Sequence, residues 1–196
     1  MKRFLPLFFI LLLASGFIAS CNTPPHREPF PQLTYQHLAP INLDVAQIVI
    51  QDAYQPPMAD PHVDQDFPTP PATAARQWAK DRLKAVGSDG VAKFTILDGS
   101  AIDVPLPRTT GLNGMVTQDQ SDRYDVTLTV RLEVENRMGN HSGAITASAQ
   151  RSESVAEDMT LNEREKLWLK MTDELMKQLN AELEKQIGAH LKEFVR

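Results

Sequence analysis

YDVTLTVRLEVEN, residues 124–136, is the stretch of sequence that decides the fold. From Tyr124 to Glu135, apolar side chains alternate strictly with polar or charged ones. Successive side chains of a β-strand point to opposite faces of its sheet, so this period of two predicts a strand with one buried face and one wet face. Such a strand is typical of an antiparallel sheet that is covered on one side only.

Further strands are predicted on both sides of this stretch. The pair Gly139-Asn140 is typical of a hairpin turn, and AITASAQRSES, residues 144–154, predicts the returning strand. Upstream, VAKFTILDGSAIDVPL, residues 91–106, predicts a strand bent at Asp98-Gly99-Ser100. A first, β-branched strand begins at Ile41 in INLDVAQIVIQ.

Two helices are predicted from spacing and end signals. The first begins at Pro70-Pro71 with Thr69 as its cap, and Gly87 is the expected stop. The second begins with a capping box formed by Thr160 and Glu163. Its apolar stripe has spacings of three and four and consists of Trp168, Met171, Leu175, Leu179, Leu183, Ile187 and Leu191.

The order of elements is therefore β-α-β-β-β-α. It predicts the α+β class, with a two-layer sandwich in which two helices cover one face of a mainly antiparallel four-stranded sheet. The first helix is expected to join two parallel strands by a right-handed crossover.

The beginning of the chain has the features of an export signal. Lys2 and Arg3 precede an apolar run over residues 4–14, which is far shorter than the about 20 residues needed to span a bilayer as a helix. Ile18-Ala19-Ser20-Cys21 then follows, and it resembles the lipobox of bacterial lipoproteins. The resemblance implies cleavage between Ser20 and Cys21 and acylation of Cys21, and two or three acyl chains anchor a protein stably to a membrane.

These features predict three parts of the chain. Residues 1–20 form the lipoprotein signal peptide, residues 21–40 form a lipidated, Pro-rich tether, and residues 41–196 form a single α+β domain. Eleven of the 14 prolines lie between Pro24 and Pro71. Residues 52–71 are expected to be a long loop, and loops of this length are either functional or disordered.

Composition excludes several classes of function. Removal of the leader, with Lys2 and Arg3, changes the formal net charge from −5 to −7, which argues against nucleic acid as a partner. Cys21 is the single cysteine, so its acylation leaves no thiol for a disulfide, a metal site or a nucleophile. We expect no cofactor, and the membrane as a partner through the lipid on Cys21.

No catalytic constellation is evident in the sequence. The histidines are scattered, and LDGS, residues 97–100, is interpreted as a bulge or turn and not as a nucleophile site. DPHVDQD, residues 60–66, contains potential cation ligands, but its spacing fits no defined metal loop, so we predict a solvated acidic loop and no metal. The basic residues of the first helix, which are Arg76, Lys80, Arg82 and Lys84, are interpreted as its solvated face.

The layout of residues 18–196 resembles two groups of Gram-negative lipoproteins. One group assembles lipopolysaccharide and supports an outer-membrane β-barrel, and the other serves ABC-type lipid or solvent transport systems. The resemblance implies a non-enzymatic accessory with a barrel or transporter as its partner, located at the outer membrane and facing the periplasm. The alternatives are a carrier of a lipid or other apolar ligand between sheet and helices, an enzyme, or a structural spacer.

Overall fold

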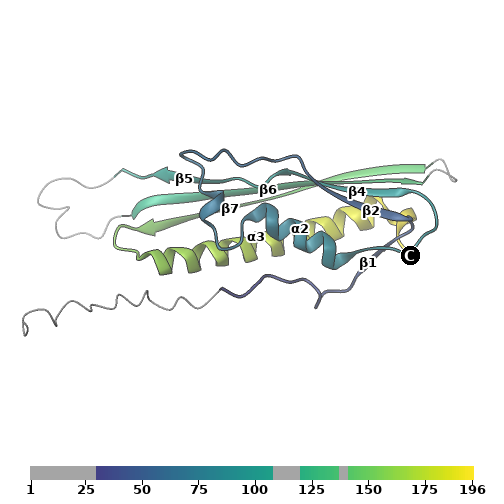
Figure 1. Ribbon diagram of the computed structural model, residues 1–196, viewed down its shortest axis with the longest axis horizontal. Coiled ribbons are helices and arrows are strands. Elements are labelled where there is room, and N and C mark those ends of the chain that lie inside the picture. Colours follow the sequence, from purple (N-terminus) through teal and green to yellow (C-terminus); the bar gives the residue numbers. More distant parts are fainter. Residues whose placement is uncertain (1–29, 108–119, 137–140) are drawn as a thin grey trace, which may run out of the picture. The chain divides into compact units, whose positions relative to one another are not determined.

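The computed structural model describes residues 30–107, 120–136 and 141–196 (Figure 1). The chain divides into two compact units, Met1–Pro31 and Gln32–Arg196, and the fold reported below is that of the second unit. Ser20 and Cys21, which carry the predicted cleavage and lipidation sites, lie outside the described residues. Among the described helices, none has both the length and the apolar character that crossing a bilayer requires.

The alternating stretch forms strand β6, Gln120–Asn136, as predicted. Its apolar side chains are buried and its polar side chains lie on the other face. β6 pairs antiparallel along its whole length with β7, His141–Ala156, from Gln120 opposite Ala156 to Asn136 opposite His141. The hairpin pairing is therefore confirmed, while the predicted turn at Gly139-Asn140 lies outside the described residues.

The other edge of β6 pairs with two strands in succession. β4, Val91–Asp98, pairs with the second half of β6, and β5, Ala101–Pro105, pairs with its first half. The register shifts between Ile96 and Asp98, where the Ser100 amide donates to Asp98 Oδ1 at 2.9 Å. The predicted bend is confirmed, but it is sharp enough to divide the predicted strand, so the main sheet has five strands instead of four.

The sheet is mixed because β2, Gln47–Asp52, runs parallel to β4. Helix α2, Pro71–Arg82, lies between these two strands in the chain, in agreement with the predicted crossover. The sheet order is β2-β4-β6-β5, with β7 on the second edge of β6.

The first predicted strand is in fact two strands. β1, Ile41–Leu43, pairs in parallel with β3, Leu83–Ala85, in a separate two-stranded sheet. The strand breaks before β2 because the Asp44 amide donates to the Phe194 carbonyl at 2.8 Å, and this bond draws the chain toward the C-terminal segment. Pairing with β1 is also the reason why α2 ends at Arg82 and not at Gly87.

The expected cap of α2 is also wrong. The N-cap position is Pro70, and no side chain caps the helix there. Thr69 instead uses its carbonyl to accept a hydrogen bond from Thr172 Oγ1 at 3.1 Å, so that it joins the loop to the last helix.

Helix α3, Leu161–His190, has the predicted capping box. The Glu163 amide donates to Thr160 Oγ1 at 3.4 Å, and the Thr160 amide donates to Glu163 Oε2 at 2.9 Å. The thirty residues extend about 45 Å at about 1.5 Å per residue. All members of the predicted stripe, from Trp168 to Leu191, are buried.

Thr160→Ala is expected to lower the free energy of unfolding by about 0.5–2 kcal/mol, because it leaves a helix amide without its acceptor. Urea denaturation followed by far-UV circular dichroism measures the change. Thr160→Ser retains the hydroxyl and is the matched control, and an equal loss in both variants would contradict the capping role.

Both helices cover the same face of the sheet, so the predicted two-layer α+β sandwich is confirmed (Figure 1). Trp78 of α2 packs on Phe94 of β4 with ring centroids 5.7 Å apart. Arg82 corrects the prediction of a solvated basic face, because it is only 3% exposed. Its guanidinium donates to Asn180 Oδ1 at 2.9 Å and to Glu184 Oε1 at 2.8 Å, and these bonds join α2 to α3.

Candidate docking surface

The face of the sheet opposite the helices consists of the outward side chains of β4, β6 and β7, and we call it the outer face. Its centre is formed by small hydroxyl side chains, and Thr129 Oγ1 and Ser148 Oγ share a hydrogen bond of 2.7 Å there. The outward positions of β7 are exposed at Thr146, Ser148, Gln150 and Ser152. The wet face predicted from the alternation in β6 is therefore confirmed for that strand, while Leu97 of β4 is a large apolar side chain that is 41% exposed on the same side.

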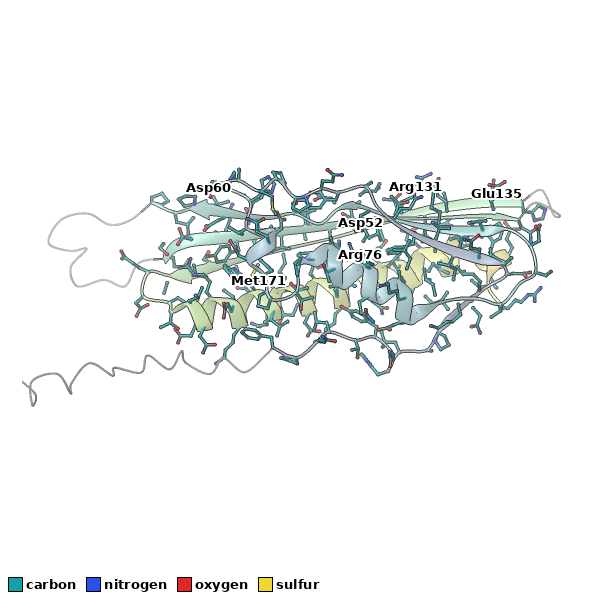
Figure 2. The ribbon with its side chains drawn as sticks, in the orientation of Figure 1. Asp52, Asp60, Arg76, Arg131, Glu135 and Met171 are labelled. Atoms are coloured by element: carbon teal, nitrogen blue, oxygen red, sulfur yellow. The ribbon has the colours of Figure 1, made fainter. Side chains whose placement is uncertain are left out.

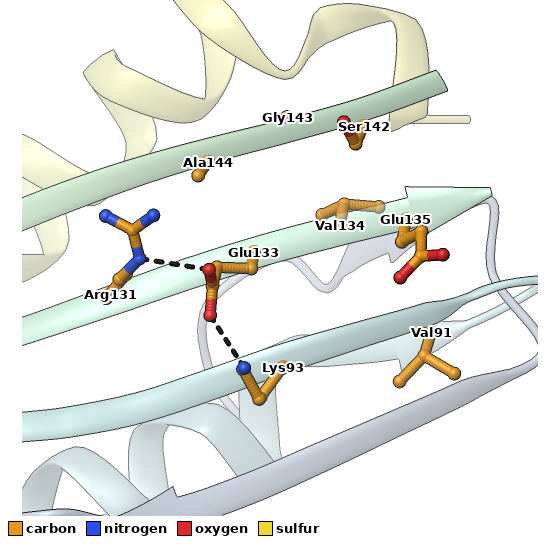
Figure 3. Close-up of a pocket in the computed structure, with 9 residues that line it drawn as sticks. All are labelled: Val91, Lys93, Arg131, Glu133, Val134, Glu135, Ser142, Gly143 and Ala144. Carbon is orange, nitrogen blue, oxygen red and sulfur yellow. Dashed lines mark ion pairs between the residues drawn. The ribbon is translucent and has the colours of Figure 1, made fainter. Parts of the chain in front are cut away.

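A hollow of about 560 Å³ lies on the outer face at the end near His141 (Figure 3). It crosses three strands, because neighbouring rows of β4, β6 and β7 meet there in register. The side chains around it include Val91, Lys93, Arg131, Glu133, Glu135 and Ser142, and Figure 2 labels Arg131 and Glu135 among them. Charged groups therefore surround the hollow, while smaller apolar groups form part of its floor.

Glu133 is the centre of an ion-pair cluster in the hollow (Figure 3). Its carboxylate lies 2.9 Å from Lys93 Nζ and 3.2 Å from Arg131 Nε. Hydrogen bonds from Lys93 and then Arg131 lower the pKa of Glu133 below its ordinary value. Partly exposed ion pairs contribute about 0–1 kcal/mol each to the free energy of unfolding. The main effect of this cluster is therefore to fix the positions of the charged groups on the outer face.

Glu133 is expected to titrate below the ordinary pKa of glutamate, and Lys93→Met is expected to raise its midpoint. Since the folded pKa is lowered, the stabilising contribution of this carboxylate is present above the unfolded pKa and disappears as pH falls through the folded pKa. Carboxyl-detected NMR over acidic pH measures the midpoint. Lys177→Met, which removes a partner of Asp173 on α3, is the control and leaves Glu133 unchanged; an unchanged midpoint in Lys93→Met would contradict the assignment.

The prediction of a solvated acidic loop over residues 60–66 is wrong at Asp64. This residue begins the short 3₁₀ helix η1, Asp64–Asp66. Asp64 is only 2% exposed, and its carboxylate accepts hydrogen bonds from the Ala101 amide and from the Tyr54 hydroxyl, the latter at 3.2 Å. His62 Nδ1 lies 3.5 Å from the same carboxylate. The loop is solvated at Asp60 and Asp66, but Asp64 joins it to the start of β5.

Backbone contacts attach the same loop to the sheet. The Val63 amide donates to the Ala101 carbonyl, and the Asp103 amide donates to the Pro61 carbonyl, both at 2.9 Å. Burial, followed by the neighbouring Asp64 carboxylate, raises the pKa of Tyr54 above its ordinary range. Within the described ranges, no group of three His, Cys, Asp or Glu side chains is arranged to hold a metal ion.

Among the residues that the structure describes, the remaining histidines and the segment 97–100 lie apart from one another. Ser100 and Asp98 form the turn between β4 and β5. His37, His62 and His141 lie on separate segments, and His141 Nδ1 lies 3.6 Å from Glu193 Oε2. His26 lies outside the described residues.

The layer between sheet and helices is filled by large side chains. Phe94, Leu128 and Leu132 of the sheet and Leu175 and Leu179 of α3 are all fully buried. Two further hollows, of about 220 Å³ and about 490 Å³, lie beside the acidic loop and beside the start of α3. Sequence reasoning did not find these hollows or the one on the outer face, because each depends on how separate elements meet.

Comparisons with known proteins add little to this description. No family model matches the chain, and no curated protein matches it. Among solved structures, the chain is similar to a PelC dodecamer from Paraburkholderia phytofirmans, with 10% identity and a TM-score of 0.24 over 78% of this chain and 96% of that chain. Because this TM-score is so low, the class assigned here, a two-layer α+β domain with an open polar sheet face, rests on the chain's own residues.

Proposed function

We propose that this protein is a non-enzymatic lipoprotein of the bacterial cell envelope that acts as an assembly or transport accessory. Acyl chains on Cys21 hold it at a membrane, and the outer face docks on a partner protein. The partner is an outer-membrane barrel or a component of an ABC-type transport system.

The observation that carries this proposal is the contrast between the two faces of the sheet. One face is covered by α2 and α3, and the other presents hydroxyl groups, paired charges and a hollow of about 560 Å³. Exposed hydroxyl and charged side chains supply the hydrogen-bonding groups of a polar interface, and Leu97 of β4 adds an exposed apolar contact. Lys93, Arg131 and Glu133 provide a charge pattern that selects the partner's orientation.

The filled core favours docking over the carrier alternative. A carrier of an apolar ligand needs an apolar cavity of about 300–1,000 Å³ inside the protein. The space in which such a ligand would lie, between β6 and α3, is occupied by Leu128, Leu132, Leu175 and Leu179. The sequence supports the anchor, since the lipobox residues Ile18–Cys21 follow a short apolar segment.

Copurification of the full chain from detergent-solubilised envelopes tests the proposal. We expect a stoichiometric barrel or transporter component with the native chain and with Ala181→Arg, which changes an exposed residue of α3. The same partner is expected to be lost with Ser148→Arg, which places a large charged side chain at the centre of the outer face. The two variants add the same side chain at small, exposed positions.

Three outcomes would overturn the proposal. Retention of the partner by Ser148→Arg would exclude the outer face as the docking surface. Bound lipid without a protein partner would support the carrier instead. Mass spectrometry that found an unmodified Cys21, or the leader still attached, would exclude the lipid anchor.

A further inference from the structure

The outermost strand of the main sheet is β7, and its far edge pairs with no other described strand (Figure 3). This edge extends over the whole strand, His141–Ala156. Among the backbone hydrogen bonds that the described ranges form outside helices and ladders, none uses residues 142–154. The backbone N–H and C=O groups along the edge are therefore open to another chain.

The register identifies which groups lie at the free edge. The Thr127 amide donates to the Ser100 carbonyl at 2.9 Å, so odd-numbered residues of β6 direct their backbone groups toward β4 and β5. Even-numbered residues of β6 therefore bond to β7, and Leu128 lies opposite Ala149. The even-numbered residues of β7 direct their backbone groups away from β6. Their side chains form the exposed outward row of β7, from Ser142 to Ser154.

The other edges of the main sheet have features that prevent the addition of a strand. β2 has six residues and is followed by Pro56 and Pro57. β5 has five residues, and the loop before η1 covers it through backbone bonds to Ala101 and Asp103. β7, in contrast, has sixteen residues and contains no proline. Short edge strands, prolines and covering loops are common protections against strand addition, so β7 is the edge that is left open.

Helix α3 lies beneath β7 on the inner face of the sheet. A Cβ added to Gly143 would lie 2.5 Å from Leu191 Cδ2, and Arg151 pairs with Glu174 of α3. The small inward side chain of Ala147, between these two contacts, lets the helix come close. α2 packs beneath β4 and β6, and neighbouring helices need about 8–10 Å between their axes, which is about two strand spacings. This spacing agrees with a position of α3 beneath β7.

The position of α3 argues against a second copy of the chain at this edge. Paired strands lie about 4.7–4.9 Å apart. If β7 paired with β7 of another copy about a two-fold axis, the two α3 helices would lie at a similar separation. That separation is shorter than the about 8–10 Å that packed helices need. An extended segment with no helix beneath it has no such conflict.

We propose that β7 binds an extended segment of the partner protein, which adds a sixth strand to the five-stranded sheet. Main-chain hydrogen bonds to the even-numbered residues of β7 supply the affinity, and contacts beside Thr146, Ser148 and Gln150 supply the specificity. Because the outward row of β7 is uncharged, the partner's segment has uncharged, strand-forming side chains. The inference deepens the proposed function and rests on it for the existence of a protein partner.

Amide hydrogen exchange followed by NMR tests this proposal on the full acylated chain in detergent micelles. In the chain alone, we expect faster exchange at Thr146, Ser148 and Gln150 than at Ala147 and Ala149, whose amides face β6. Equally slow exchange in both rows would show that the edge is already covered and would overturn the inference.

The probe is a synthetic peptide of about nine residues, in which threonine and valine alternate between terminal lysines. We expect it to slow exchange at Thr146, Ser148 and Gln150 by at least about fivefold, with no change at Ala147 and Ala149. The matched control has the same sequence with N-methyl groups on the threonine and valine residues. This change removes the backbone donors of the peptide, so we expect no effect.

Three results with these peptides would overturn the inference. The first is unchanged exchange with the unmodified peptide, and the second is equal slowing by both peptides. The third is a dimer of the chain whose formation slows exchange in the outward row of β7, because it would assign the edge to a second copy.

Thr146→Pro tests the same edge with the natural partner. The proline ring removes an outward amide but no bond to β6, so we expect an unchanged far-UV circular dichroism spectrum. In copurification from detergent-solubilised envelopes, Thr146→Pro is expected to reduce the recovered barrel or transporter component at least about fivefold. Thr146→Val retains the amide and is expected to recover that component fully.

The two substitutions on β7 separate this inference from the proposed function. Retention of the partner by Thr146→Pro, together with its loss in Ser148→Arg, would overturn the inference while the proposed function stands. Loss in Thr146→Pro with retention in Ser148→Arg would support the edge and exclude the outer face. Retention by both variants would overturn both proposals.

Discussion

Trp78→Ala is expected to lower the free energy of unfolding by about 3–5 kcal/mol, as is typical for removal of a fully buried aromatic side chain. Trp78 is fully buried and packs on Phe94 of β4. Its indole Nε1 donates to Asn180 Oδ1 at 2.8 Å, so it joins the sheet, α2 and α3 in one contact region. Urea denaturation of the domain, with the midpoint and slope fitted together, measures the loss.

Two further variants serve as controls for Trp78→Ala. Met58→Ala changes a side chain that is 79% exposed, and we expect it to alter stability by no more than about 0.5 kcal/mol. Trp78→Phe retains much of the packing and removes the indole donor, while Asn180 Oδ1 still accepts from Arg82. A loss below about 1.5 kcal/mol in Trp78→Ala, outside the range for large-to-small core changes, would contradict the packing described here.

Asp64→Ala is expected to destabilise the protein by about 2–3 kcal/mol, because it removes a buried carboxylate and leaves its donors without an acceptor. The Ala101 amide and the Tyr54 hydroxyl both donate to this carboxylate. The loop before Asp64 is therefore expected to open more often, and faster hydrogen exchange or proteolytic cleavage in residues 53–63 measures that opening.

Asp66→Ala is the matched control for Asp64→Ala. It removes the same functional group from the same short helix, η1, but at an exposed position, so we expect a change within about 0.5 kcal/mol. Asp64→Asn retains one carbonyl oxygen as an acceptor and is expected to have an intermediate effect. Equal losses at Asp64 and Asp66 would show that burial of Asp64 is not what attaches the loop.

Sequence patterns predicted a strand or helix correctly where the interactions that form it join residues close in sequence. The alternation from Tyr124 to Glu135 predicted β6 because side-chain direction in a strand follows directly from position. The capping box at Thr160 and Glu163 predicted the start of α3 because its hydrogen bonds join residues three apart. The same alternation predicted the outer face, but its hollow also needs residues of β4 and β7 in register with Glu133.

By itself, the sequence determined the long hairpin strand and the amphipathic last helix, because each depends on periodicity within one segment. It also determined the two-layer α+β class, because that class follows from the order of the elements along the chain. Only the tertiary structure decided that Ile41 pairs with Leu83 and that Arg82 lies buried against Asn180 and Glu184. It also decided that the Ala101 amide donates to Asp64 and that the Tyr35 amide donates to Asp81 of α2. The partners in these contacts are tens of residues apart in sequence. Whether a charged side chain such as Arg82 is buried depends on these distant partners and cannot be predicted from its neighbours in sequence.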